Sequence, residues 1–197
     1  MDKDKPEALK SDILTLPNLL SLFRILLAPV FLWSLLNKKA FEALLIFFLA
    51  GLTDVLDGFT ARIWHQRSKL GTILDPAGDK LLMVTSYVVL SLASVASPNF
   101  IPIWLTLVVF ARDLLIVTGA FIAYLSWRQT TFTPSLLGKI STICQVGTVF
   151  LVLLLNFYQV SPWYMDAVYY LTLLATLASG VHYFIFGLQT LRERRKV

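Results

Sequence analysis

Four aspartates lie in or beside long apolar runs of this chain: Asp54, Asp57, Asp75 and Asp79. A charged side chain at the centre of a bilayer costs about 2.5–3.5 kcal/mol on insertion scales. The first two are three residues apart and the last two are four apart, so each pair shares one face of a helix. If the two helices pack antiparallel, the four carboxylates converge. Hard oxygen ligands in such a group favour Mg²⁺ or Mn²⁺ over a soft metal.

Small residues and a cation lie among these aspartates. Arg62 adds a fixed positive charge beside the acids, and three small residues would let a bulky polar ligand approach the backbone: Gly58, Ala61 and Gly71. Carboxylates with a divalent cation and a nearby arginine are suited to binding a pyrophosphate and transferring a phosphoryl group. The alternative is structural: the acids pair with Arg62, Lys69 and Lys80, and the small residues serve close helix packing.

The composition around this motif is that of a helical membrane protein. Hydrophobic residues make up 57% of the 197 residues, and the mean hydropathy is +0.72. We therefore expect an all-α, polytopic membrane protein with about six transmembrane helices, because apolar runs of spanning length recur along the chain. The predicted segments are roughly 18–36, 40–64, 74–96, 101–127, 136–157 and 164–191.

A single domain is expected over residues 1–197, since no polar linker or low-complexity stretch divides the chain. It consists of a cytoplasmic N-terminal juxtamembrane segment at 1–15, a membrane domain at 16–191 and a basic cytoplasmic tail at 192–197. Before the first membrane helix, roughly Pro6–Leu16 is expected to be either a short amphipathic helix on the headgroups or part of a disordered tail. The N-terminus is too polar for a signal peptide, so the first membrane helix is expected to insert uncleaved.

The distribution of basic residues predicts the orientation. Most Lys and Arg flank the apolar segments on one side, whereas the opposite flanks carry Lys38 and Lys39. The positive-inside rule then places both termini, and the loop between the second and third segments, on the cytoplasmic side of a cell membrane. The formal net charge of +5 points to anionic lipid headgroups as partners and not to nucleic acid, because the basic residues gather at the segment ends.

The thiol and imidazole side chains exclude other kinds of site. A single cysteine, Cys144, rules out an intramolecular disulfide and a cysteine-based zinc site. His65 and His182 are too far apart in sequence to have the spacing of a metal-binding pair. Nothing in the sequence supports Ser-His-Asp chemistry.

The spacing of the acidic motif resembles the signature of the CDP-alcohol phosphotransferases. The pattern is D-x2-D-G-x2-A-R-x8-G-x3-D-x3-D, and it begins at Asp54 and ends at Asp79. The resemblance extends from Leu16 to about Leu191. It implies a six-helix integral membrane enzyme, often a homodimer, whose site opens to the cytoplasm.

The resemblance also implies a role for each motif position. Asp54, Asp57 and Asp75 would bind the metal, and Asp79 would lie close to it and act as the general base on the acceptor alcohol. The resulting alkoxide would attack the β-phosphorus of CDP-diacylglycerol, and CMP would leave. The CDP moiety would be held by Asp57, Gly58, Ala61, Arg62 and Gly71.

Other segments bear on the acceptor alcohol. Leu16–Arg24, Leu74–Lys80 and Leu137–Thr142 are similar to the bacterial phosphatidylglycerophosphate synthases of this family, although Gly78 stands where alanine is usual. This similarity predicts glycerol 3-phosphate as the acceptor and phosphatidylglycerophosphate as the product. The pair Arg112–Asp113 departs from those enzymes, which more often carry Arg-Glu.

Arg-Asp at this place, together with Lys139, Thr142 and Gln145, is similar to the cardiolipin synthases, for which phosphatidylglycerol is the acceptor. Both acceptors carry a phosphate, and the candidate cations for it are Lys80, Arg112 and Lys139. Two structural alternatives stay open: Lys139 snorkels to the interface, or Arg112 simply pairs with Asp113. A divalent-cation transporter is a more remote alternative, because carboxylates within a membrane also mark ion paths.

Overall fold

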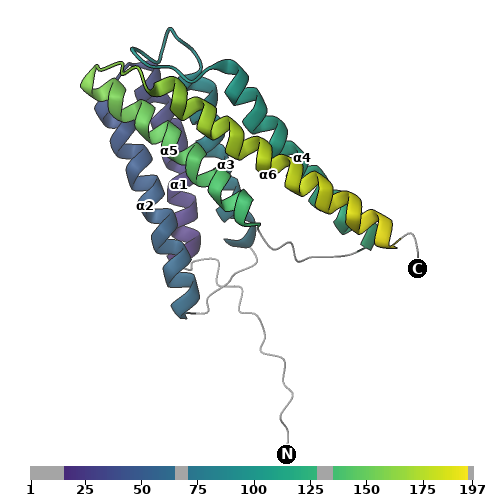
Figure 1. The fold of residues 1–197 in the computed structure, drawn as a ribbon. Coiled ribbons are helices and arrows are strands. Elements are labelled where there is room, and N and C mark those ends of the chain that lie inside the picture. The colour runs from purple at the N-terminus through teal and green to yellow at the C-terminus, as the bar shows by residue number, and fades with distance from the viewer. Residues whose placement is uncertain (1–15, 65–70, 128–134, 195–197) are drawn as a thin grey trace, which may run out of the picture. The chain divides into compact units, whose positions relative to one another are not determined.

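The computed structural model describes residues 16–64, 71–127 and 135–194, and these residues form six helices. Figure 1 shows their course. The helices are α1 (Leu16–Leu36), α2 (Ala40–Trp64), α3 (Gly71–Leu90), α4 (Ile103–Trp127), α5 (Leu136–Tyr158) and α6 (Met165–Arg194). The predicted all-α class is confirmed for the described residues. The N-terminal segment at 1–15 and the end of the basic tail at 195–197 lie outside them.

One predicted boundary is wrong. The third segment was expected to continue to residue 96, but α3 ends at Leu90. The chain then turns, with the Val95 and Ala96 amides both donating to the Leu92 carbonyl. Pro98 and Pro102 follow, and proline is unfavourable in the interior of a helix. Two apolar residues of this loop are nevertheless buried, since Ala96 is 4% exposed and Ile101 is fully enclosed, whereas Leu92 and Phe100 are exposed. Hydrophobicity here therefore reflects packing of a loop and not a longer helix.

The chain divides into two compact units, one ending at Val89 and the other beginning at Leu90. In the first unit α1 packs against α2. The buried apolar residues recur every three or four positions on each helix: Ala28, Phe31 and Leu35 on α1, and Ala43, Phe47 and Ala50 on α2. The rings of Phe31 and Phe47 lie 6.0 Å apart. A short turn with Lys38 in the left-handed region joins the two helices.

In the second unit α6 packs against both α4 and α5. A polar seam runs along the α5–α6 contact, and its members are all buried: Ser141, Gln145 and Thr148 on α5, and Thr172, Thr176 and Ser179 on α6. Gln145 Nε2 donates to Ser141 Oγ at 3.1 Å and to Thr176 Oγ1 at 3.2 Å. The hydroxyls of Thr148 and Thr172 lie 2.7 Å apart. Each helix thus places its polar side chains against the other.

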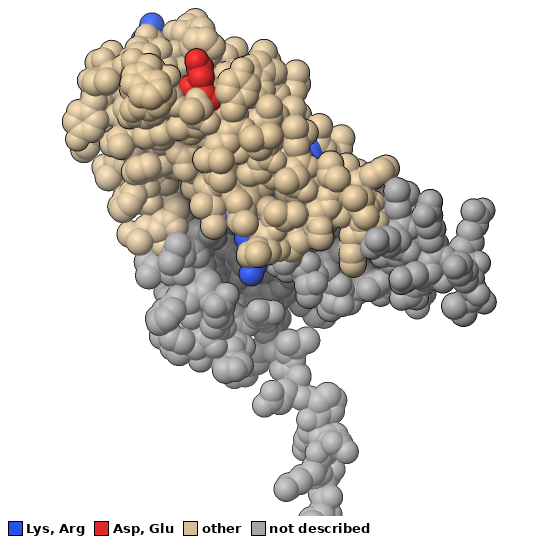
Figure 2. All heavy atoms as spheres, in the orientation of Figure 1, with Lys and Arg blue, Asp and Glu red and all other residues tan. Residues whose placement is uncertain are grey.

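The outward surfaces of the same helices are apolar. Ile143 on α5 is 70% exposed and Leu174 on α6 is 64% exposed. In Figure 2 the described part of the visible face carries few charged side chains. Leu136–Tyr158 and Met165–Gly187 are long and apolar enough to cross a membrane. A polar seam inside and an apolar surface outside is the arrangement expected of helices in lipid.

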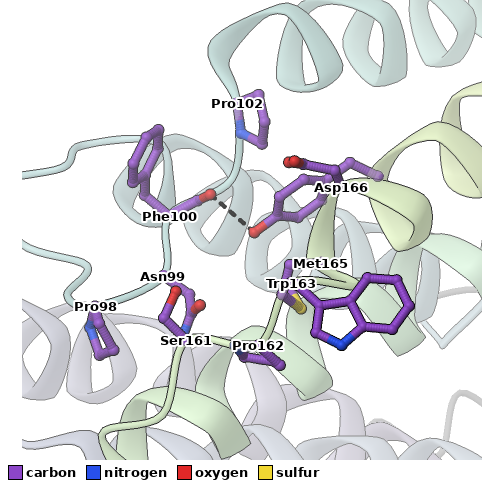
Figure 3. Close-up of a pocket in the computed structure, with 10 residues that line it drawn as sticks. Pro98, Asn99, Phe100, Pro102, Ser161, Pro162, Trp163, Met165 and Asp166 are labelled. Carbon is purple, nitrogen blue, oxygen red and sulfur yellow. Dashed lines mark hydrogen bonds between the residues drawn. The ribbon is translucent and has the colours of Figure 1, made fainter.

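A second polar cluster lies at the C-terminal end of α5. Asn156 Oδ1 accepts from the Asn99 backbone amide at 2.8 Å and from Asn99 Nδ2 at 3.0 Å, and Asn156 Nδ2 donates to the Asn99 carbonyl at 2.9 Å. Beside this pair lies a pocket of about 320 Å³, shown in Figure 3. Tyr169 Oη, at its edge, donates to the Phe100 carbonyl at 2.9 Å. These contacts join the loop after α3 to the turn between α5 and α6.

We predict that Asn156→Ala destabilises the protein, because the backbone amide and the backbone carbonyl of the buried Asn99 both lose their partner. An unsatisfied buried polar group costs about 1–3 kcal/mol. The measurement is the thermal unfolding midpoint in detergent, followed by reaction of the single thiol of Cys144 with a fluorogenic dye. Ser161→Ala, an exposed position of the neighbouring turn, is the control and should leave the midpoint unchanged. Equal midpoints for Asn156→Ala and wild type would show that the hydrogen bonds between Asn156 and Asn99 do not stabilise the fold.

Candidate functional site

The helices carry the acidic motif as its spacing requires. Asp54 and Asp57 both lie within α2, and Asp75 and Asp79 both lie within α3. Their side chains are outside the described residues, so the convergence of the four carboxylates stays a prediction. The same holds for the contacts of Gly58, Ala61, Arg62 and Gly71, which lie in α2 or at the first position of α3. Within the part of the chain that the structure describes, no group of three or more His, Cys, Asp or Glu side chains gathers.

The donor chemistry of this motif fits a hard divalent cation. Four carboxylates would supply oxygen ligands for such an ion, and the surrounding α2 sequence is largely apolar, with Arg62 as its one basic residue. Each pair lies within a single helix, which holds the backbone positions of its members rigidly relative to one another. Asp54, Asp57, Asp75 and Asp79 are therefore the residues that could hold a metal in this chain.

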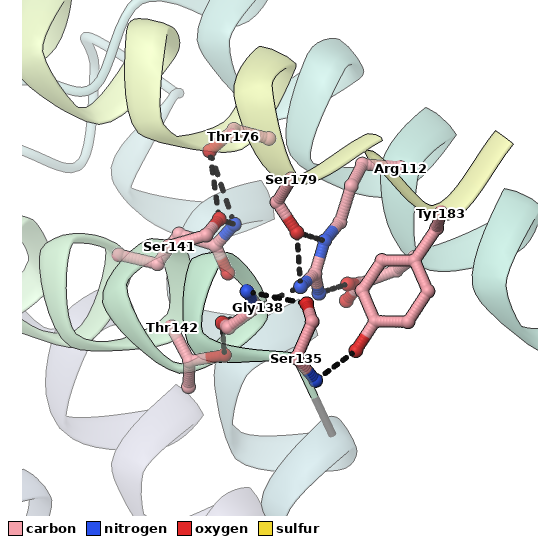
Figure 4. A network of polar contacts seen from close by, with 10 residues as sticks. Arg112, Ser135, Gly138, Ser141, Thr142, Thr176, Ser179 and Tyr183 are labelled. Carbon is pink, nitrogen blue, oxygen red and sulfur yellow. Dashed lines mark hydrogen bonds and ion pairs between the residues drawn. The ribbon is translucent and has the colours of Figure 1, made fainter. Parts of the chain in front are cut away.

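A second group of polar residues centres on Arg112 of α4, in the other compact unit (Figure 4). Its side chain is 9% exposed. Nε and Nη2 donate to Ser179 Oγ at 3.2 and 2.9 Å, and Nη1 donates to Asp113 Oδ1 at 2.9 Å. Nη2 also lies 3.5 Å from the Gly138 carbonyl. The guanidinium carbon lies 5.8 Å from the centre of the Tyr183 ring, within the range of a cation–π contact.

The beginning of α5 is built around the same tyrosine. Ser135 caps the helix, because its Oγ accepts the Gly138 amide at 3.0 Å. The Ser135 backbone amide in turn donates to Tyr183 Oη at 3.1 Å. Gly138 is fully packed, and a Cβ added to it would lie 2.8 Å from Tyr183 Oη. Only glycine leaves room at this position for the tyrosine to reach the cap.

The structure brings two of the three predicted acceptor cations to one region. Arg112 contacts Gly138, and Lys139 is the next residue of α5 and is exposed. Lys80 is also exposed, but it belongs to α3 in the first unit. Arg112 does pair with Asp113, as its structural alternative predicts. A guanidinium has five N–H groups. The contacts given above use one of the two on Nη1, so among the described residues the second has no acceptor.

Sequence reasoning missed the residues of α6. Ser179 and Tyr183 are four apart, so they share one helix face, and both contact Arg112. The sequence signal that could have identified them is a pair of hydroxyl-bearing side chains one turn apart in an otherwise apolar helix. Thr142 and Gln145, noted for their similarity to cardiolipin synthases, do not contact Arg112 directly: Thr142 Oγ1 donates to the Gly138 carbonyl at 3.1 Å, and Gln145 lies in the polar seam.

Residues 14–180 match the model of the CDP-alcohol phosphatidyltransferase family. The human protein named cardiolipin synthase (CMP-forming) is 36% identical over 90% of this chain and 63% of its own length. That of Streptomyces coelicolor is 38% identical over 66% of this chain and 60% of its own length. The CDP-diacylglycerol–glycerol-3-phosphate 3-phosphatidyltransferase of Aquifex aeolicus is 32% identical over 75% of this chain and 80% of its own length. The chain thus spans a little under two thirds of the length of the first two relatives.

We predict that Gly138→Ala destabilises the protein, because the new methyl group displaces the Tyr183 hydroxyl from the Ser135 amide. Overpacking of this kind costs about 1–3 kcal/mol. Gly147→Ala on the same helix is the matched control, since a Cβ there meets nothing within 4 Å. The control should keep or raise the thermal unfolding midpoint, because alanine favours a helix by up to about 1 kcal/mol over glycine. An equal shift of the midpoint in both variants would contradict the close packing of Gly138 against the Tyr183 hydroxyl.

Proposed function

This chain belongs to the CDP-alcohol phosphatidyltransferase family, and from that membership we propose that it transfers a phosphatidyl group from CDP-diacylglycerol to a phosphate-bearing alcohol, releasing CMP. The observation that carries the proposal is the complete acidic signature, which lies within α2 and the first half of α3 and inside the matched range 14–180. A cation transporter is disfavoured, because the acids fall in one half of the chain and no repeat of them occurs in the other.

We assign the metal to the four aspartates. Asp54, Asp57 and Asp75 would hold the ion, with Asp79 beside it, and their hard oxygen donors suit Mg²⁺ or Mn²⁺. When bound, the divalent cation supplies a Lewis acid that offsets negative charge on the pyrophosphate and on the departing CMP. Gly58, Ala61 and Gly71 would leave space for the CDP moiety.

The remaining roles fall to side chains of the chain itself. Arg62 would bind the nucleotide phosphates. The Asp79 carboxylate would take the proton of the acceptor hydroxyl, because a base of this kind must lie within hydrogen-bond reach of the group it activates. The acceptor oxygen then forms a bond to the β-phosphorus, and the bond from that phosphorus to the bridging oxygen of CMP breaks.

Phosphatidylglycerol is the acceptor that we favour, which makes the product cardiolipin. The support is the name of relatives that are 36–38% identical, together with the Arg112–Asp113 pair. The glycerol 3-phosphate predicted from Leu16–Arg24 remains the second candidate, because the Aquifex aeolicus relative is named for that acceptor and is matched over 80% of its length. In either case the acceptor brings a phosphate, for which we propose Arg112, Lys139 and Lys80 as binding cations.

We further propose that the six helices cross a cell membrane as one domain, with the site on the cytoplasmic side. The outward apolar side chains of α5 and α6 support membrane insertion, and the basic residues at the segment ends support this orientation. A homodimer is proposed on the family resemblance alone.

The acceptor is tested by incubating the purified protein with labelled CDP-diacylglycerol, a divalent cation and one acceptor at a time. We expect CMP release and cardiolipin with phosphatidylglycerol. Product formed only with glycerol 3-phosphate would reverse the choice of acceptor and leave the reaction type intact. Metal flux into liposomes, without release of CMP from CDP-diacylglycerol in the presence of either acceptor, would overturn the proposed function.

Asp79→Asn tests the assignment of the base. The amide cannot accept the hydroxyl proton, so we expect CMP release to fall about 10²–10⁴-fold, the usual contribution of a general base. Binding of CDP-diacylglycerol, measured by equilibrium dialysis of a labelled donor, should persist. Asp166→Asn replaces an exposed carboxylate at the start of α6 and serves as the control, with activity unchanged. Turnover retained in Asp79→Asn would remove Asp79 from this role.

A further inference from the structure

Two hydroxyl-bearing residues of α6 hold the Arg112 guanidinium and the beginning of α5 together. Ser179 Oγ accepts two of the five N–H groups of Arg112, at 3.2 and 2.9 Å. Ser179 is fully buried, so water does not compete for these hydrogen bonds. Tyr183, one turn further along α6, lies with its ring 5.8 Å from the guanidinium carbon. Figure 4 shows the Ser179 side chain directed toward Arg112 and the Tyr183 ring beside it, with the Tyr183 hydroxyl directed toward Ser135.

The same tyrosine links Arg112 to the first turn of α5. Its hydroxyl accepts the Ser135 amide, and Ser135 caps the helix through the Gly138 amide. The Gly138 carbonyl faces Arg112 Nη2 at 3.5 Å, and Lys139 follows it directly. Arg112 is therefore linked to the Lys139-bearing turn of α5 in two ways, by this direct contact and through Tyr183 of α6.

We propose that Ser179 and Tyr183 are positioning residues for the phosphate of the acceptor. They hold Arg112 and the Lys139-bearing turn of α5 in the arrangement that binds this phosphate, without touching it themselves. The inference rests on the proposed function, and it assigns to α6 a part in selecting the acceptor. The acidic motif lies in α2 and α3, whereas Ser179 and Tyr183 lie in α6, so under this proposal binding of the CDP-linked donor is expected not to change.

The physical basis is preorganisation of a charged side chain. A free arginine has many rotamers, and a ligand that binds it must restrict them. Ser179 fixes the plane of the guanidinium by taking Nε and Nη2 together, which leaves the Nη1 edge as the part that can turn toward a ligand. Asp113 accepts one N–H on that edge; among the described residues none is seen to accept the second, which in this proposal faces the anion.

The test compares Ser179→Ala with Thr176→Val, two variants that each remove one buried hydroxyl from the same face of α6. Thr176 bonds to Ser141 and Gln145 and not to Arg112, so it controls for general weakening of the α5–α6 contact. Steady-state CMP release is measured while the donor and the acceptor are varied in turn. For Ser179→Ala we expect KM for the acceptor to rise about 10- to 100-fold, the range for loss of a hydrogen bond to a charged group. KM for CDP-diacylglycerol should not change.

Tyr183→Phe keeps the ring beside Arg112 and removes the hydroxyl that accepts the Ser135 amide. It should raise the acceptor KM in the same direction, and Tyr170→Phe, at an exposed position of α6, should not. A double-mutant cycle completes the test. In an Arg112→Lys background the lysine lacks the planar fork, so Ser179→Ala should add little further loss.

Each result decides between the possibilities. An acceptor KM raised equally by Ser179→Ala and Thr176→Val would overturn the inference and reduce Ser179 to helix packing. Additive effects of Arg112→Lys and Ser179→Ala would do the same. Absence of CMP release from the wild-type protein with either acceptor would instead overturn the proposed function, and the inference with it.

Discussion

The packing of the second unit depends on one constraint: polar side chains between helices with apolar outer surfaces must satisfy one another. Serine, threonine and glutamine line the α5–α6 contact and bond to one another, as Thr148 does to Thr172 at 2.7 Å. Because the outer faces carry exposed leucine and isoleucine, hydrophobicity alone gives α5 no preference for α6 over lipid. Small side chains and hydrogen bonds then determine which faces meet.

This constraint extends from the seam to the Arg112 cluster. Thr172, Thr176, Ser179 and Tyr183 follow one another along one side of α6 at spacings of three or four residues. The first two bond to side chains of α5, whereas Ser179 bonds to the arginine of α4. The row of hydroxyl side chains that joins α6 to α5 therefore continues into a residue that binds the guanidinium. The buried guanidinium is tolerated because it donates to acceptors on three helices.

Sequence patterns predicted the long helices well because their limits carry local signals. The starts of α2 and α5 agree with prediction, and α5 has a serine cap with glycine three residues later. The end of α3 was missed because the loop from Ser91 to Pro102 buries apolar residues as a helix would. Arg112 and Lys139 were recognised individually, but their link through Gly138 was not. Contacts over 26 and 67 residues have no signature in a single sequence.

The residues proposed for the reaction and two of the three cations proposed for the acceptor lie in different compact units. The signature of the reaction, from Asp54 to Asp79, lies wholly before Val89, and Arg112, Lys139 and Ser179 lie wholly after it. In the proposed function, metal and CDP binding would tolerate little change, since every ligand would have to keep its spacing on α2 and α3. The Arg112 side chain is held instead by contacts with α6, whose replacement would alter the placement of this one arginine. In the function proposed, a family that shares one reaction can therefore vary its acceptors through the second unit, and Ser179 is where such variation would act most directly on charge.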